Sequence, residues 1–171
     1  QEIQSYQELS GEYEVQTIFL GGGTPSLLTP EQIEQIFDAI YHIFSVNENA
    51  EITMEMNPGT VDIEKLCAMK AAGVNRLSIG LQSAQNEELK MLGRIHTYEE
   101  FLETWRLTEQ AGFKNRNIDL MSALPGQTME SYEDTLSKVL ALEPEHISAY
   151  SLILEEETVF YDWYEKGKLD R

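Results

Sequence analysis

The chain is poor in cysteine, and this limits the cofactors that it can hold alone. Its 171 residues include one cysteine, Cys67. A single cysteine cannot form an internal disulfide, and by itself it cannot bind a zinc ion or an iron-sulfur cluster. Because Cys67 lies between Leu66 and Ala68, we expect its side chain to pack as a small apolar group.

Positive charge and long apolar segments are also scarce. Only 12 Lys and Arg residues oppose 30 Asp and Glu residues, which gives a formal net charge of −18. Nucleic acids and anionic membrane surfaces would repel such a chain, so neither is an expected partner. No segment approaches the roughly 20 apolar residues of a transmembrane helix, and the polar residues 1–8 do not resemble a signal peptide. We therefore expect a soluble cytoplasmic protein that binds small molecules or other proteins.

Short apolar segments alternate with amphipathic ones along the chain. The sequence predicts strands at residues 15–20, 51–56, 76–81, 117–124 and 146–154. Helices are expected after Thr29, near residues 62–72 and 86–92, and after Thr97, Thr128 and Thr158. Thr97 and Glu100 have the spacing of a capping box. With 42% apolar residues and no low-complexity tract, these five strand-helix units suit one globular α/β domain.

Strands separated by helices run parallel, because each helix returns the chain to the same end of the sheet. A partial barrel and a doubly wound sheet both satisfy this pattern. No GxGxxG dinucleotide motif follows the first strand, which weakens the doubly wound alternative. We therefore favour part of a parallel (β/α) barrel.

Unusual residues collect where the predicted strands end. Three glycines, Gly21, Gly22 and Gly23, follow the first strand, and they allow either a ligand or a tight turn close to the backbone. Glu55 ends the second strand, and Asp119 lies in the fourth. Either acid could accept hydrogen bonds from ribose hydroxyls or an ammonium group, or could cap a local loop. Since barrel active sites occupy the carboxyl ends of the strands, we expect the site there.

Other polar and aromatic residues receive weaker assignments. Gln82 ends the third strand, where its amide needs a polar partner. Arg94 follows Gly93 and could pair with a carboxylate or remain a solvated charge. The histidines His96 and His146 lack metal-ligand spacing, so we interpret them as structural or surface residues. Aromatic residues in the second half are expected in the core: Tyr132, Tyr150, Phe160 and Trp163.

Five motifs in order give the chain a family resemblance. They are GGGTPS at residues 21–26, EMNPGT at 55–60, NRLSIGLQS at 75–83, GRIHT at 93–97 and LPGQT at 124–128. Together they resemble radical S-adenosylmethionine (SAM) proteins of the oxygen-independent coproporphyrinogen III oxidase and heme chaperone family. LPGQT and HISAYSLILEEETVF at 146–160 resemble the HemW-type heme chaperone branch. The resemblance implies an incomplete parallel barrel that binds SAM at a [4Fe-4S] cluster across the carboxyl ends of its strands.

The resemblance also implies roles for individual residues. Gly22, Gly23 and Thr24 would contact the methionine part of SAM, and Arg94 would pair with its carboxylate.

For the rest of the ligand, the resemblance implies that Glu55, Gln82 and Asp119 bind the amino group or the ribose. Ile153 matches a position near the adenine. No residue is assigned a catalytic or metal-binding role.

The chain departs from the family pattern in three respects. The CxxxCxxC motif that holds the cluster is absent from residues 1–171, so we interpret the chain as a fragment that follows the first strand and its cluster loop. The resemblance places the heme-handling domain beyond Arg171, and the fragment alone is expected to be inactive. Ser122 and Ala123, and likewise Glu156 and Glu157, replace residues that include glycines in the family.

Three functions remain open from the sequence. The first is a SAM- and cluster-binding protein that transfers heme, with heme or porphyrin as ligand and a heme-acceptor protein as partner. The second is the oxidative decarboxylation of coproporphyrinogen III. The third, from a different class, is a metal-free barrel lyase or a structural domain that binds no SAM.

Overall fold

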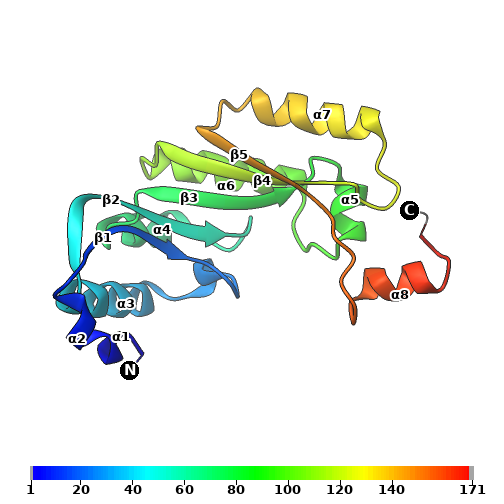
Figure 1. Ribbon diagram of the computed structural model, residues 1–171. Helices are drawn as coiled ribbons and strands as arrows, with labels where there is room; N and C mark the ends of the chain where they lie inside the picture. The colour runs from blue at the N-terminus through cyan, green and yellow to red at the C-terminus, as the bar shows by residue number, and fades with distance from the viewer. Residues whose placement is uncertain (1, 170–171) are drawn as a thin grey trace.

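The computed structural model describes residues 2–169, and five parallel strands form its centre. They are β1 (Glu14–Leu20), β2 (Ser45–Met56), β3 (Arg76–Gln82), β4 (Asn115–Ser122) and β5 (His146–Ser151). Each strand pairs with the next along the chain, in the order β1-β2-β3-β4-β5. The sheet twists and curves, and the helices that connect its strands lie on its outer side (Figure 1). The expected partial (β/α) barrel is therefore confirmed, as a half-barrel.

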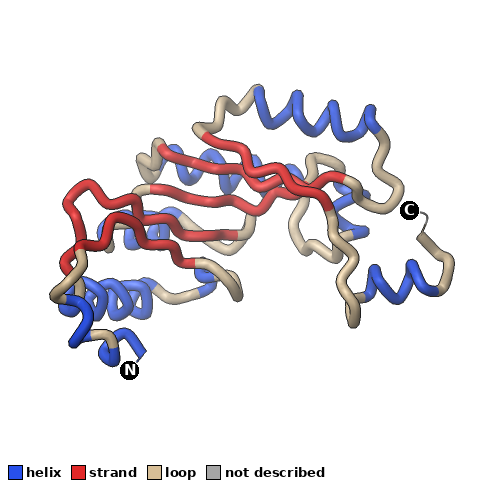
Figure 2. The backbone as a smooth tube through the Cα atoms, in the orientation of Figure 1, coloured by secondary structure: helices blue, strands red, loops and turns tan. Residues whose placement is uncertain are grey.

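Helices follow the strands where the sequence predicts them. They are α3 (Pro30–Ile43), α4 (Ile63–Ala71), α5 (Asn86–Met91), α6 (Tyr98–Gln110), α7 (Met129–Leu140) and α8 (Val159–Glu165). Thr97 and Glu100 form the expected capping box, and Thr29 forms another with Gln32. Short helical turns that the sequence analysis did not predict are α1 (Glu2–Ser5), α2 (Gln7–Ser10) and the 3-10 helix η1 (Pro25–Leu27). Figure 2 shows α8 and the loop before it set apart from the sheet.

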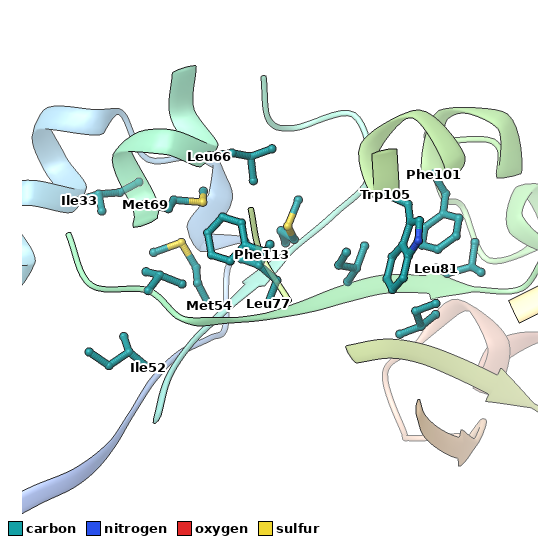
Figure 3. Close-up of a cluster of buried hydrophobic side chains, with 14 of the residues drawn as sticks. Ile33, Ile52, Met54, Leu66, Met69, Leu77, Leu81, Phe101, Trp105 and Phe113 are labelled. Carbon is teal, nitrogen blue, oxygen red and sulfur yellow. The ribbon is translucent and has the colours of Figure 1, made fainter. Parts of the chain in front are cut away.

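The hydrophobic core lies between the outer face of the sheet and the helices. Met54 and Leu77 from the strands pack with Leu66 and Met69 from α4, and Phe101 from α6 joins the same cluster (Figure 3). Along each strand, alternate residues point to opposite faces of the sheet. The inner face therefore receives the polar residues between these apolar ones.

Polar side chains on the inner face bond to one another across the strands. The Arg76 guanidinium donates to Thr53 Oγ1 at 3.3 Å. Asn117 Nδ2 donates to Ser78 Oγ at 2.7 Å, and His146 Nδ1 bonds Asn117 Oδ1. These bonds offset the cost of placing polar groups inside the half-barrel.

Three strands have a boundary that differs by two or more residues from the prediction, whereas β1 and β3 differ by one residue each. β2 begins at Ser45 rather than at residue 51, because Glu14 and Val15 pair with its first residues before the register shifts. β4 covers Asn115–Ser122 instead of 117–124. β5 ends at Ser151 rather than 154, since β4 ends opposite it at Ser122. Beyond that point the backbone N–H of Leu152 still donates to the Ser122 carbonyl oxygen at 2.9 Å, whereas Ile153 and Leu154 lie past the end of β4.

The structure corrects the prediction for Cys67, whose side chain is exposed on α4. Leu66 and Met69 occupy the buried face of this short helix, and at 100° per residue Cys67 points elsewhere. No helix between residues 2 and 169 has the length and apolar character needed to cross a bilayer.

Candidate functional site

A polar cavity of about 260 Å³ opens at the carboxyl ends of the strands. Six of the eight predicted ligand-binding residues line it: Gly22, Thr24, Glu55, Gln82, Arg94 and Asp119. Gly23 belongs to the same turn without lining the cavity. Ile153 lies outside the cavity with 76% of its surface exposed, so its place near an adenine remains a prediction.

The glycine-rich turn after β1 is held by the end of β2. The backbone N–H of Gly22 donates to Glu55 Oε2 at 3.0 Å. A Cβ atom on Gly21 would lie 2.7 Å from the Phe19 ring and 3.0 Å from the Glu55 carboxylate. A side chain at position 21 would therefore force the Phe19 ring or the Glu55 carboxylate to shift, whereas a Cβ on Gly22 or Gly23 would meet nothing within 4 Å. The open space beside Gly22 and Gly23 leaves their backbone accessible to a ligand.

Thr24 completes this turn in a strained conformation. Its φ angle is 61°, in the left-handed region that disfavours β-branched residues. Asn57 Nδ2 donates to Thr24 Oγ1 at 3.1 Å and holds the side chain in place. Strain of this kind persists only where surrounding contacts compensate for it, and functional sites are where it collects.

Gln82 enters the cavity through a bulge in β3. Gly80 pairs with Asp119 and Gln82 with Leu120, so the register shifts by one residue between them. Gln82 has a φ angle of 73° and is only 3% exposed. Its Oε1 accepts a hydrogen bond from the Tyr150 hydroxyl at 2.8 Å. The bulge turns the amide into the cavity, as bulges next to active sites commonly do.

Arg94 supplies the positive charge of the cavity. Gly93, at a φ angle of 70°, ends α5 and turns the chain so that the half-buried Arg94 faces the site. One guanidinium nitrogen donates to Asn57 Oδ1 at 3.2 Å. No carboxylate among residues 2–169 lies within 4.0 Å of this guanidinium. Its fork is thus available to an anionic ligand group.

Two carboxylates complete the polar lining. Asp119 accepts from Ser78 Oγ at 3.1 Å and from Asn117 Nδ2 at 2.7 Å. Glu55 accepts from Gly22 N, as described above. Each carboxylate oxygen has more than one lone pair, so both groups retain acceptors for a ligand. The site therefore combines one guanidinium with two carboxylates, which suits a ligand that carries charges of both signs.

Glu88 of α5 links three segments near the cavity through hydrogen bonds, and it was not among the residues predicted from the sequence. It is 8% exposed, and it accepts from Ser83 Oγ at 2.6 Å, Ser131 Oγ at 2.7 Å and Gln127 Nε2 at 3.0 Å. These partners come from the loop after β3, the LPGQT loop and α7. The LPGQT loop therefore contributes to the site through support and does not line the cavity.

Five lining residues were not among those predicted from the sequence: Met56, Asn57, Ser78, Gly80 and Tyr150. Tyr150 was expected in the core, but it is 45% exposed and lines the cavity. Its place two residues after Ser148 on β5 was the available signal, because the period of two puts both on the inner face. Asn57 and Ser78 also line the site. Asn57 stood at the expected strand end, whereas only the register reveals that Ser78 faces Asp119.

Neither His96 nor His146 lines the cavity, although His146 Nδ1 bonds Asn117 Oδ1, and Asn117 in turn donates to Asp119. His96 is buried, and its Nε2 lies 3.3 Å from the Leu81 carbonyl oxygen. Burial lowers the pKa of His96. Between residues 2 and 169, no group of three or more His, Cys, Asp or Glu side chains could hold a metal ion.

Comparison with known proteins identifies the family. The model of the Radical SAM superfamily matches residues 2–139. The heme chaperone HemW of Bacillus subtilis (strain 168) is 40% identical over 161 residues, which cover 94% of this chain and 42% of that protein. The heme chaperone HemW of Escherichia coli (strain K12) is 44% identical over 147 residues, or 86% of this chain and 39% of that protein. The chain thus spans about two fifths of the length of these relatives.

A solved structure agrees with this assignment. The coproporphyrinogen III oxidase HemN from Escherichia coli, described as a radical SAM enzyme, matches with a TM-score of 0.84 and 30% identity. The match covers 99% of this chain and 38% of that one. Proteins of the superfamily use SAM and a [4Fe-4S] cluster, as its name and these relatives indicate. This chain therefore belongs to the radical SAM superfamily and lies on its HemW-like branch.

Proposed function

We propose that the cavity binds the amino-acid and ribose parts of SAM. The observation that carries this proposal is the Arg94 guanidinium, which faces the cavity without a carboxylate partner among the described residues. A ligand carboxylate would complete its fork with two parallel hydrogen bonds. Asn57 already holds the other side of the guanidinium at 3.2 Å and so limits its rotation.

The acidic residues suit the remaining groups of SAM. The ammonium needs an anion, and the ribose hydroxyls need acceptors. Glu55 and Asp119 provide negative charge for the ammonium and acceptor oxygens for the hydroxyls, and Gln82 adds an amide. The open backbone at Gly22 and Gly23 leaves room for the methionine chain. The donor set therefore fits the cofactor that the family implies.

The residues of this chain do not fit the cluster. Its one cysteine, Cys67, is exposed on α4, and no cluster of metal-ligating side chains exists among residues 2–169. We propose that the full-length parent supplies the cluster ligands from a segment preceding residue 1. When bound, SAM and the reduced cluster supply radical chemistry. This chain's residues bind the cofactor and orient it.

For the full-length parent, we propose a role as a heme chaperone that takes heme or a porphyrin as its ligand and delivers heme to an acceptor protein. Identities of 40% and 44% to HemW proteins, against 30% to HemN, favour this role over decarboxylation of coproporphyrinogen III. A cytoplasmic location remains our prediction. A relative from Bos taurus, radical S-adenosyl methionine domain-containing protein 1, is mitochondrial by name and is 36% identical over 168 residues.

Calorimetric titration of SAM into the cluster-loaded full-length parent, without oxygen, tests the cofactor site. Arg94→Ala should weaken binding on the order of 10- to 100-fold, because a charge-assisted pair is lost. Arg94→Lys should recover only part of that loss, since an ammonium lacks the planar fork.

The matched control is Arg106→Ala, because Arg106 pairs with Glu103 on the outer surface of α6 and should not affect binding. Thermal melts report whether each variant is folded. Unchanged affinity in a folded Arg94→Ala variant would contradict the proposed site. Heme titration and a decarboxylation assay with coproporphyrinogen III then separate the chaperone from the oxidase.

A further inference from the structure

One side chain of β5, Tyr150, forms a hydrogen bond with Gln82 at the end of β3. Tyr150 lies on β5 and pairs with Met121 of β4. Its hydroxyl passes over β4 and donates to Gln82 Oε1, at the end of β3, at 2.8 Å. Tyr150 is thus bonded to a residue two strands away, at the lining of the cavity.

This bond favours one orientation of the Gln82 amide. The Tyr150 oxygen could also accept from Nε2 of a flipped amide, but its own proton would then have no acceptor among residues 2–169. Oε1 is occupied by Tyr150, so the two N–H donors on Nε2 are directed elsewhere. Nε2 has no hydrogen-bond partner among residues 2–169, and it lies 3.2 Å from the position that a Cβ on Gly80 would take. Gly80 also lines the cavity. The amide therefore presents donors, and not its carbonyl, beside Gly80.

The backbone alone would not fix this arrangement. The bulge and the positive φ of Gln82 place its Cα at the rim, but the terminal torsion of a glutamine amide is broad and nearly two-fold. Without the Tyr150 hydroxyl, the amide could turn over at little cost. A flipped amide would present an acceptor, which would repel a ligand carboxylate oxygen and would require a ribose hydroxyl to act as the donor instead.

We propose that Tyr150 is a positioning residue for SAM binding, whose hydroxyl orients Gln82 so that Nε2 donates to an oxygen atom of the ligand. This inference rests on the proposed cofactor site and extends it, because Tyr150 acts through Gln82.

The surroundings of Tyr150 keep its hydroxyl a donor. Burial raises the pKa of Tyr150, and the nearby carboxylates of Asp119 and Glu55 act in the same direction. The Gln82 hydrogen bond and the Arg94 charge oppose this shift less strongly than burial favours it. At neutral pH the phenol is therefore protonated and can donate to Oε1.

A double-mutant cycle on the cluster-loaded full-length parent tests the proposal. SAM is titrated into the wild type, Tyr150→Phe, Gln82→Ala and the double variant. Tyr150→Phe removes one oxygen and keeps the ring, and we expect it to weaken SAM binding about 3- to 10-fold. In the Gln82→Ala background, the same change should have no further effect, because the two residues act as a unit.

Three outcomes would overturn the proposal. Equal affinity of wild type and Tyr150→Phe would show that the hydroxyl does not matter. An equal loss in both backgrounds would mean that Tyr150 touches the ligand directly. A similar loss in Tyr132→Phe, on α7 outside the cavity, would show that any tyrosine hydroxyl has this effect. Failure of the wild type to bind SAM would instead contradict the proposed function itself, so the two failures are distinguishable.

Discussion

Gly22 donates its backbone N–H to Glu55 Oε2 at 3.0 Å. The turn after β1 is therefore bonded to a side chain near the carboxyl end of β2. Glu55 thereby combines two properties in one carboxylate. It accepts a hydrogen bond that shapes the glycine-rich turn, and it places a negative charge in the cavity. The two properties can be separated by substitution.

Glu55→Gln should weaken SAM binding on the order of 10-fold without lowering the melting temperature. The glutamine Oε1 can still accept from Gly22, whereas the charge that attracts the ligand ammonium is gone. Glu55→Ala removes both properties and should lower the affinity and the melting temperature together. Titration and thermal melts on the full-length parent measure the two effects. Equal affinity in Glu55→Gln and wild type would rule out an electrostatic role for this residue.

Glu88→Ala should lower the free energy of unfolding by about 2 to 3 kcal/mol, because three donors lose a charged acceptor in a buried position. These donors are Ser83, Gln127 and Ser131. Glu87→Ala, at the neighbouring exposed position of α5, is the matched control and should remain close to wild type. Urea denaturation of the chain measures both. A Glu88→Ala variant as stable as the control would mean that water replaces the carboxylate.

Ala123→Gly should stabilise the chain by about 0.5 to 1 kcal/mol. Ala123 has a φ angle of 57°, where a Cβ costs roughly 1 to 2 kcal/mol. Glycine removes this cost, and its larger unfolded-state entropy offsets only part of the gain. Ala141→Gly is the control, since Ala141 has an ordinary helical φ of −66° and should lose stability on substitution. Denaturation curves that show both variants destabilised would contradict the strain assigned to Ala123.

The chain of residues 1–171, incubated with iron and sulfide without oxygen, should not show the absorption of one [4Fe-4S] cluster per chain. One exposed cysteine cannot provide the ligands of a cluster. Iron and sulfide analysis alongside the spectrum gives the stoichiometry. A full cluster in a monomeric sample would contradict the prediction, and a Cys67→Ser variant would show whether several chains had shared one.

Much of the site followed from the sequence because strand ends and loop motifs are local features. Glu55 and Asp119 needed only the parallel topology to be placed at one rim, and the structure brings both to the cavity. The sequence also shows that Ala123 and Glu157 depart from the family pattern, and both residues have a positive φ in the structure.

What the sequence could not provide depends on register and on side-chain direction. The bulge before Gln82 shifts the β3–β4 pairing by one residue, and no sequence motif predicts this bulge. Tyr150 was assigned to the core because it is aromatic, whereas the inner face of the half-barrel, where it lies, is polar and open to the cavity. The exposure of Cys67 depends on which face of α4 is buried. The sequence of this nine-residue helix does not decide that, because the cysteine lies between two apolar neighbours.

His96 should make the stability of the chain depend on pH below neutrality. It is 5% exposed, and burial lowers its pKa, with a smaller contribution in the same direction from Arg94. The Leu81 carbonyl and Glu100 raise it by less. The unfolded chain, with an ordinary histidine pKa of about 6.5, therefore binds a proton more readily than the folded chain does. Stability from this residue is present above about pH 6.5 and is lost as the pH falls toward the folded-state pKa.

The measurement is the urea midpoint of the wild type and of His96→Asn at intervals between about pH 7.5 and 5.5, above the range in which most carboxylates titrate. The asparagine amide can donate in place of the imidazole but cannot be protonated. Its midpoint should be lower than that of the wild type at pH 7.5, because packing is lost, and the difference should narrow as the pH falls. Parallel curves for the two proteins would mean that folding does not lower the pKa of His96, whereas a gap that widens toward acid would mean that the folded chain stabilises the imidazolium, contrary to its burial beside Arg94.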